Sequence, residues 1–162
     1  RNGTDFGIRV SSTGDAWFTG PAQMARGLLF AGFSESDGNP DIGDSCITET
    51  VGLGGFSMAA SPAVVGFIGA GSLADAIGYT KSMAEITVGP NPQWALPTVN
   101  MMGVPTGIDI RKVLSTGLLP VINTAIANKL PGRSQIGAGI VNPPLTCFEQ
   151  AFVKFAELNG VN

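Results

Sequence analysis

Glycine and proline interrupt this chain at short intervals, and this constrains its fold more than any other feature. The 162 residues include 23 glycines and 11 prolines, spread along the chain rather than gathered in one linker. Glycine weakens helices and strands, and proline ends or bends them. We therefore expect many short elements in a single domain over residues 1–162, without an internal repeat.

Five stretches have the pattern of β-strands. Residues 6–12 (FGIRVSS) alternate apolar and polar side chains, and residues 16–20 (AWFTG) can pair with them as a hairpin. Residues 27–33 (GLLFAGF) predict a buried strand, whereas residues 117–128 and 134–142 predict strands buried on both faces.

Two stretches have the pattern of helices. Ser72 is a candidate N-cap with Asp75 at the third position, before an apolar face that includes Leu73, Ala76, Ile77, Met83 and Ala84. Near the C-terminus, Asn142 is a candidate N-cap before two prolines, and Asn159-Gly160 is a stop signal. The apolar face expected for this second helix consists of Leu145, Phe148, Phe152 and Phe155.

Strands and helices that mix without strict alternation predict an α+β fold (irregular α/β). We expect short mixed strands, a central helix pair and a C-terminal amphipathic helix.

Charge is scarce, and histidine is absent. Only 13% of the residues are charged, about half the usual fraction, so we expect another subunit or further chain to cover part of the surface. With a net charge of −3 and no basic run, binding of nucleic acid is not expected. Without histidine, the chain cannot form a Ser-His-Asp or Cys-His site or an imidazole metal site, and we assign it no metal ligands.

Cysteine usage and hydropathy predict a cytoplasmic protein. Cys46 and Cys147 either form a disulfide or are two buried thiols in a reducing compartment, and we expect the thiols. The longest apolar stretch, residues 55–71, is broken by serine, proline and glycine, so we expect no membrane span.

Residues 64–79 (VVGFIGAGSLADAIGY) raise the question of a dinucleotide site. Gly69-Ala70-Gly71 before a helix fits the turn of a Gly-x-Gly-x-x-Gly/Ala fingerprint. About twenty residues further on, however, residues 89–92 (GPNP) offer no carboxylate for a ribose. We therefore expect a glycine-rich helix–loop–helix junction, and no NAD or other cofactor.

The most suggestive acidic cluster lies in residues 39–50 (NPDIGDSCITET). Asp41, Asp44 and Glu49 repel one another unless a cation, a basic residue or a polar substrate group compensates. We predict that Asp44 and Glu49 point into a shared pocket as catalytic residues, while Asp41 shapes the turn. Alternatively, Asp41 and Asp44 are only turn and capping residues.

Four further residues are candidate substrate ligands. Asp109 and Arg111 share a face if their segment is extended, and Arg111 suits a carboxylate or a phosphate; a surface ion pair is the alternative. Asn123 is an amide within an apolar run, and Asn142 precedes a helix N-terminus, which favours anions.

Six blocks of this chain resemble, in the same order, the C-terminal part of a bacterial family long catalogued as uncharacterised. They are RNGTDFGIRV, WFTGPAQ, DIGDSCITETVGLGGFSMAASPAVV, GVPTGIDIRKV, GLLPVINTAIANK and GAGIVNPPLTCFEQA. One member of that family is a subunit of oxamate carbamoyltransferase, and members are several hundred residues long. The resemblance therefore implies that this chain is the C-terminal portion of a longer one.

The resemblance also implies an activity, carbamoyl transfer in allantoin catabolism. Oxalurate and phosphate would give oxamate and carbamoyl phosphate, in an enzyme with other subunits, one of them similar to succinyl-CoA synthetase. A non-catalytic scaffold or ligand-sensing subunit is the alternative. The family supplies no catalytic residues to carry over, but small anionic substrates need cations. The cations considered are Arg1, Arg9, Arg111, Lys112, Lys129 and Arg133.

Overall fold

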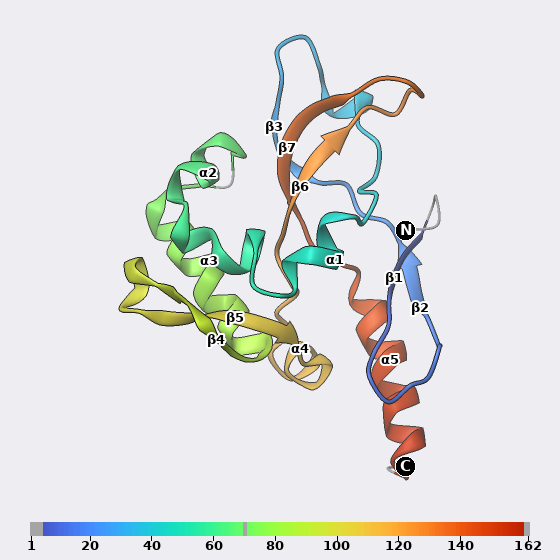
Figure 1. The fold of residues 1–162 in the computed structure, drawn as a ribbon. Helices are drawn as coiled ribbons and strands as arrows, with labels where there is room; N and C mark the ends of the chain where they lie inside the picture. Colours follow the sequence, from blue (N-terminus) through green and yellow to red (C-terminus); the bar gives the residue numbers. More distant parts are fainter. Residues whose placement is uncertain (1–4, 70, 161–162) are drawn as a thin grey trace.

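The strands form three small antiparallel sheets in the computed structural model, which describes residues 5–69 and 71–160 (Figure 1). The sheets are β1 (Asp5–Ile8) with β2 (Phe18–Pro21); β3 (Arg26–Leu29), β7 (Gln135–Val141) and β6 (Ile122–Ala127) in the order β3-β7-β6; and β4 (Thr87–Leu96) with β5 (Met102–Ile108).

Helices connect and cover these sheets. They are η1 (Glu35–Asp37), α1 (Ser45–Glu49), η2 (Gly54–Ala60), α2 (Pro62–Phe67), α3 (Leu73–Ile86), η3 (Pro97–Val99), α4 (Ile110–Thr116) and α5 (Leu145–Leu158), where η marks a 3-10 helix. Figure 1 shows α3 beside the β4–β5 hairpin, α5 beside the β1–β2 hairpin and α1 between these two parts. The mixture of short strands and helices confirms the α+β class.

The N-terminal hairpin is confirmed, with Phe6 opposite Gly20 and Ile8 opposite Phe18. The strand expected over residues 27–33 is shorter than predicted, because β3 ends at Leu29 and a turn bonds the Phe33 amide to the Phe30 carbonyl. The predicted burial of this strand is wrong, because β3 is mostly exposed and Leu28 has about half of its surface open.

β6 and β7 lie within the two predicted C-terminal strands. β7 is buried from Ile136 to Val141, whereas β6 alternates and exposes Ala125. Burial on both faces is therefore right for β7 and wrong for β6, because β6 is an edge strand of its sheet.

The capping box at the start of α3 is confirmed. The Ser72 hydroxyl accepts from the Asp75 amide, and the Asp75 carboxylate accepts from the Ser72 amide at 2.6 Å. The predicted apolar face is partly wrong, because Leu73 and Ala84 are exposed. The buried face consists of Ala76, Thr80, Met83 and Ile86.

For α5 the predicted N-cap is wrong. Pro144 is the N-cap, and the Asn142 side chain bonds elsewhere, donating to the Pro120 carbonyl at 2.9 Å. The predicted end is confirmed, with Asn159 as C-cap and Gly160 at a φ of 69°. The buried face is Cys147, Phe148 and Ala151, while Leu145 and Phe152 are exposed.

The glycine-rich stretch after residue 64 joins two helices. α2 precedes Gly69 and Gly71, which have φ values of 66° and 120°, and α3 follows; Ala70 lies outside the described residues. A dinucleotide fingerprint needs a strand before the turn. The described residues therefore have the expected helix–loop–helix junction rather than that fingerprint.

The core lies between η2, α2, α3, α4 and the inner face of β6. Its fully buried side chains include Phe56, Val65, Ile68, Met83, Ile86, Val113 and Ile122. Gly55 lets η2 approach the chain just before β6, because a Cβ atom there would lie 1.8 Å from the Val121 carbonyl oxygen.

We predict opposite effects of alanine at two glycines. Gly55→Ala should lower the free energy of unfolding by about 2 kcal/mol or more, because the new methyl group meets backbone that must move. Gly78→Ala, in α3 with nothing within 4 Å of its new Cβ, should raise it by about 0.5–1 kcal/mol. Denaturant unfolding of both variants tests this, and equal effects would contradict it.

Candidate functional site

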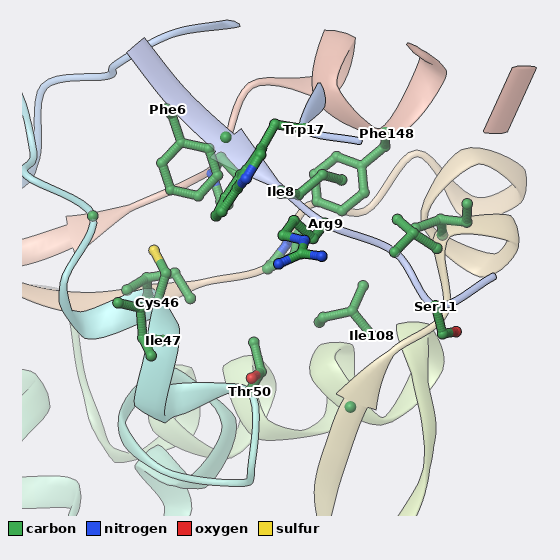
Figure 2. A pocket seen from close by; sticks show the side chains of 18 residues that line it. Phe6, Ile8, Arg9, Ser11, Trp17, Cys46, Ile47, Thr50, Ile108 and Phe148 are labelled. Carbon is green, nitrogen blue, oxygen red and sulfur yellow. The ribbon is translucent and has the colours of Figure 1, made fainter. Parts of the chain in front are cut away.

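A cavity of about 560 Å³ opens between the β1–β2 hairpin, α1 and the junction of β5 with α4 (Figure 2). Its lining residues are Phe6, Gly7, Ile8, Arg9, Val10, Ser11, Trp17, Gly43, Cys46, Ile47, Thr50, Gly107, Ile108, Ile110, Pro120, Ile122, Pro143 and Phe148.

Hydrogen bonds between the end of α1 and β5 hold together the cavity wall that these two elements form. The Gly107 amide donates to the Thr50 carbonyl at 2.7 Å, and the Thr106 hydroxyl donates to the Val51 carbonyl at 3.1 Å. Gly107 has a φ of 71°, a conformation that glycine adopts without strain. The C-terminal end of α1 is therefore fastened to β5.

Among the described residues that line this cavity, Arg9 has the one charged side chain. Its Nη2 donates to the Asp15 carboxylate at 2.5 Å and to the Gly14 carbonyl at 3.4 Å, and its guanidinium lies 5.7 Å from the ring centre of Trp17. The Asp15 side chain is fully exposed, so water screens this ion pair. Figure 2 shows Arg9 in the middle of the labelled side chains.

The predicted shared pocket of Asp44 and Glu49 is wrong. Asp44 is exposed and makes no side-chain capping bond, whereas Glu49 is buried. Five positions along a helix correspond to a rotation of about 140° between side chains, so α1 turns the two carboxylates apart. Neither residue lines the cavity.

Asp41 shapes the turn before α1, as predicted. The side chain is buried, and its Oδ2 accepts from the Gly43 amide at 2.8 Å while its Oδ1 accepts from the Thr124 hydroxyl at 2.6 Å. Asp41 thus ties this turn to β6.

Glu49 links three segments of the chain. Its Oε2 accepts from the backbone amides of Gly55 and Asn123, both at 2.9 Å. Burial raises the pKa of this carboxyl to about 7; the two amide bonds act in the opposite direction, and the nearby Asp41 charge adds to the rise. Glu49 therefore exchanges a proton near neutral pH, a property suited to acid–base chemistry.

Asp109 and Arg111 form an ion pair. The sequence left open whether these residues bind a substrate or form such a pair. Arg111 Nε and Nη2 donate to the two Asp109 oxygens at 2.9 and 2.6 Å, and the Arg111 side chain is 66% exposed. The condition for a shared face, an extended segment, is not met, because Asp109 is the N-cap of α4 and accepts from the Arg111 amide.

The side chains of Asn123 and Asn142 do not meet the Asp109–Arg111 pair. The Asn123 side chain is half-buried on β6, and its backbone amide is the group that bonds Glu49. The Asn142 side chain accepts from Arg26 Nη2 at 2.8 Å. The six predicted site residues therefore do not converge on one pocket, and their roles in chemistry remain predictions.

Cys46 and Cys147 are both free, as expected. Burial raises the pKa of Cys46 to about 12, with help from the Asp41 and Glu49 charges, and burial raises the pKa of Cys147 to about 11. At neutral pH both are protonated thiols, which are poor nucleophiles.

Residues 5–69 and 71–160 contain no group of three or more His, Cys, Asp or Glu side chains placed to hold a metal ion. None of their helices is both long and apolar enough to cross a membrane.

The sequence indicated Arg9 only as one of several available cations, and Trp17 only as part of a hairpin. No spacing relates them to α1 or β5, so only the folded chain identifies the cavity. Arg1, another cation considered from the sequence, lies outside the described residues.

We predict a pH dependence of stability that originates at Glu49. Its folded pKa of about 7 lies above the ordinary value of 4.5, so the folded protein binds more protons than the unfolded one between these values. The free energy of unfolding should therefore fall as pH rises from about 4.5 to 7, by an amount on the order of 3 kcal/mol from this group.

Glu49→Gln should flatten this dependence, since glutamine does not titrate but keeps an oxygen for the Gly55 and Asn123 amides. Asp44→Asn, at an exposed position next to α1, is the matched control and should leave the slope unchanged. Unfolding by denaturant at a series of pH values measures both, and a wild-type slope in Glu49→Gln would contradict the assignment.

A family model and curated relatives from Escherichia coli K12 are similar to this chain. The model of the family described as oxamate carbamoyltransferase subunit AllG matches residues 1–45. The uncharacterized protein YahG of Escherichia coli K12 is 53% identical over 161 residues, which are 99% of this chain and 34% of that protein. Oxamate carbamoyltransferase subunit AllG of the same organism is 50% identical over 161 residues, which are 99% of this chain and 38% of that protein.

A solved structure is also similar to this chain. The crystal structure of a conserved protein of unknown function from Enterococcus faecalis V583 matches with a TM-score of 0.91 and 54% identity, over 99% of this chain and 38% of that one. The chain spans about a third of the length of the curated relatives it matches. By these matches, the chain is similar over 99% of its length to the oxamate carbamoyltransferase subunit AllG, and over residues 1–45 to the family of that description.

Proposed function

We propose that this chain is part of a subunit of an oxamate carbamoyltransferase. The reaction converts oxalurate and phosphate into oxamate and carbamoyl phosphate. The observation that carries the proposal is the 50% identity to subunit AllG over 99% of this chain. The chain would be the C-terminal portion of that subunit and would act in the cytoplasm together with other subunits.

The chemistry defines what the assembled site must supply. A phosphate oxygen attacks the carbamoyl carbon of oxalurate, the bond from that carbon to the oxamate nitrogen breaks, and the nitrogen takes up a proton. Cationic side chains must bind the oxalurate carboxylate and the phosphate, and hydrogen-bond donors must stabilise the oxyanion that develops on the carbamoyl group. An acid must protonate the oxamate nitrogen.

Glu49 is the predicted site residue that suits proton transfer best. Its pKa of about 7 means that it is partly protonated at neutral pH. The helix that carries it, α1, also supplies Cys46, Ile47 and the following Thr50 to the cavity lining. Asp44 shares no pocket with Glu49, and Arg111 is already paired with Asp109, so we carry neither forward.

A non-catalytic scaffold subunit is the second candidate function. The six predicted site residues do not converge, and several large apolar side chains are exposed. These include Trp17, Ile47, Phe67, Val88 and Met101, each with more than half of its surface open. This many large, exposed apolar side chains favour a contact with another part of a longer polypeptide or with another subunit.

We predict that phosphate-dependent oxalurate cleavage requires the full-length protein together with its partner subunits. In that assembly, Glu49→Gln should lower kcat at least about 10-fold, the scale of a lost proton-transfer group. Arg111→Ala, which removes an exposed guanidinium outside the cavity, is the control and should retain wild-type kcat. A spectrophotometric or coupled assay of carbamoyl phosphate measures both.

Two results would change the conclusion. Wild-type turnover in a folded Glu49→Gln assembly would favour the scaffold. Absence of turnover in the complete wild-type assembly, with oxalurate and phosphate both present, would overturn the transferase proposal.

A further inference from the structure

We propose that the cavity beside α1 binds the carboxylate of a small, flat organic acid, with Arg9 holding the carboxylate and Trp17 covering the flat part of the molecule. The acid is oxamate or its carbamoylated form, an identity that rests on the function proposed above. The site itself rests on the geometry of the cavity.

The charges around the cavity favour a single anion. Of the lining residues within the described part of the chain, Arg9 is the one that is charged, and none is Asp or Glu. Most of the other lining side chains are apolar, which lowers the local dielectric and strengthens attraction to an anion. A cationic ligand is repelled by Arg9, and a neutral ligand gains apolar contacts but no charge-assisted bond.

Arg9 keeps donors for such a ligand. Its recorded hydrogen bonds with the described residues all start from Nη2, which contacts Asp15 and Gly14. The N–H groups of Nε and Nη1 make no recorded bond with those residues. Because the Asp15 side chain is fully exposed, its pairing with Arg9 is weak and does not prevent a second, less hydrated carboxylate from binding.

Trp17 provides a flat surface next to this cation. Its side chain is largely exposed, yet it stacks with Arg9 at 5.7 Å and lies close over Gly7 of β1. A Cβ atom at Gly7 would lie 3.1 Å from the Trp17 ring, so the indole lies closely against the strand at this glycine. A conjugated amide or ureido group packs well on such a face.

The cavity also offers a polar group and enough space. Thr50 is part of the lining, and no bond of its hydroxyl with the described residues is recorded, so it can bond an amide of the ligand. The volume of about 560 Å³ lies in the range of small-molecule sites. It exceeds the volume of oxamate and leaves room for the carbamoyl group.

The test measures binding directly, by titration calorimetry on the full-length protein with oxamate as the probe. Oxamide, which replaces the carboxylate by a neutral amide of the same size, is the control ligand. Oxamate should bind, and oxamide should bind at least about 10-fold more weakly, since a charge-assisted bond is lost.

Two arginine variants provide the matched pair. Arg9→Met should weaken oxamate binding at least about 10-fold. Arg111→Met should leave it unchanged, because Arg111 is also an exposed arginine paired with an aspartate but lies outside the cavity. Trp17→Ala should weaken binding several-fold, and thermal unfolding of each variant checks that the protein is folded.

Three results would overturn the proposal: no binding of oxamate to the wild-type protein, equal binding of oxamide, or wild-type affinity in folded Arg9→Met. These three binding results do not depend on the outcome of the transferase assay. An active assembly whose affinity for oxamate is unchanged by Arg9→Met would refute this site but not the proposed reaction. Arg9-dependent oxamate binding without carbamoyl transfer would support the site and refute the reaction.

Discussion

The buried carboxylate of Glu49 joins segments that lie far apart in the sequence. It accepts from Gly55, six residues away, and from Asn123, 74 residues away, and so holds α1 against η2 and β6. The same burial makes its negative charge costly, which is why the pKa rises. The position of α1, and with it one wall of the cavity, depends on this contact.

Small residues make that contact possible. Gly54 has a φ of 53°, and a Cβ atom there would lie within 2 Å of the Glu49 carboxylate, while Gly55 lies against the Val121 carbonyl. The high glycine content therefore has a local purpose at this junction: it lets backbone segments approach a buried polar group closely enough to bond it. A second contact joins β6 to the turn before α1: the Thr124 hydroxyl donates a hydrogen bond to the Asp41 carboxylate.

Interactions between neighbours in the sequence were predictable. The β1–β2 hairpin follows from alternation, the start of α3 from the Ser72–Asp75 pair, and the end of α5 from Asn159-Gly160. The β4–β5 hairpin was missed because Pro90 and Pro92 argue against a strand; it exists as a separate two-stranded sheet with a register shift between Pro90 and Ala95. Asn142 looked like an N-cap, but Arg26 and Pro120, both distant in sequence, bind its side chain instead.

The sequence by itself determined the α+β class, the absence of histidine chemistry, the helix–loop–helix junction around Gly69 and the family resemblance, because composition and local spacing carry that information. Only the tertiary structure decided that Glu49 is buried while Asp44 is exposed, and that Arg9, Trp17 and Thr50 line one cavity. The physical reason is that burial and convergence depend on contacts between β1, α1 and β5. Those contacts form between residues that no local pattern connects.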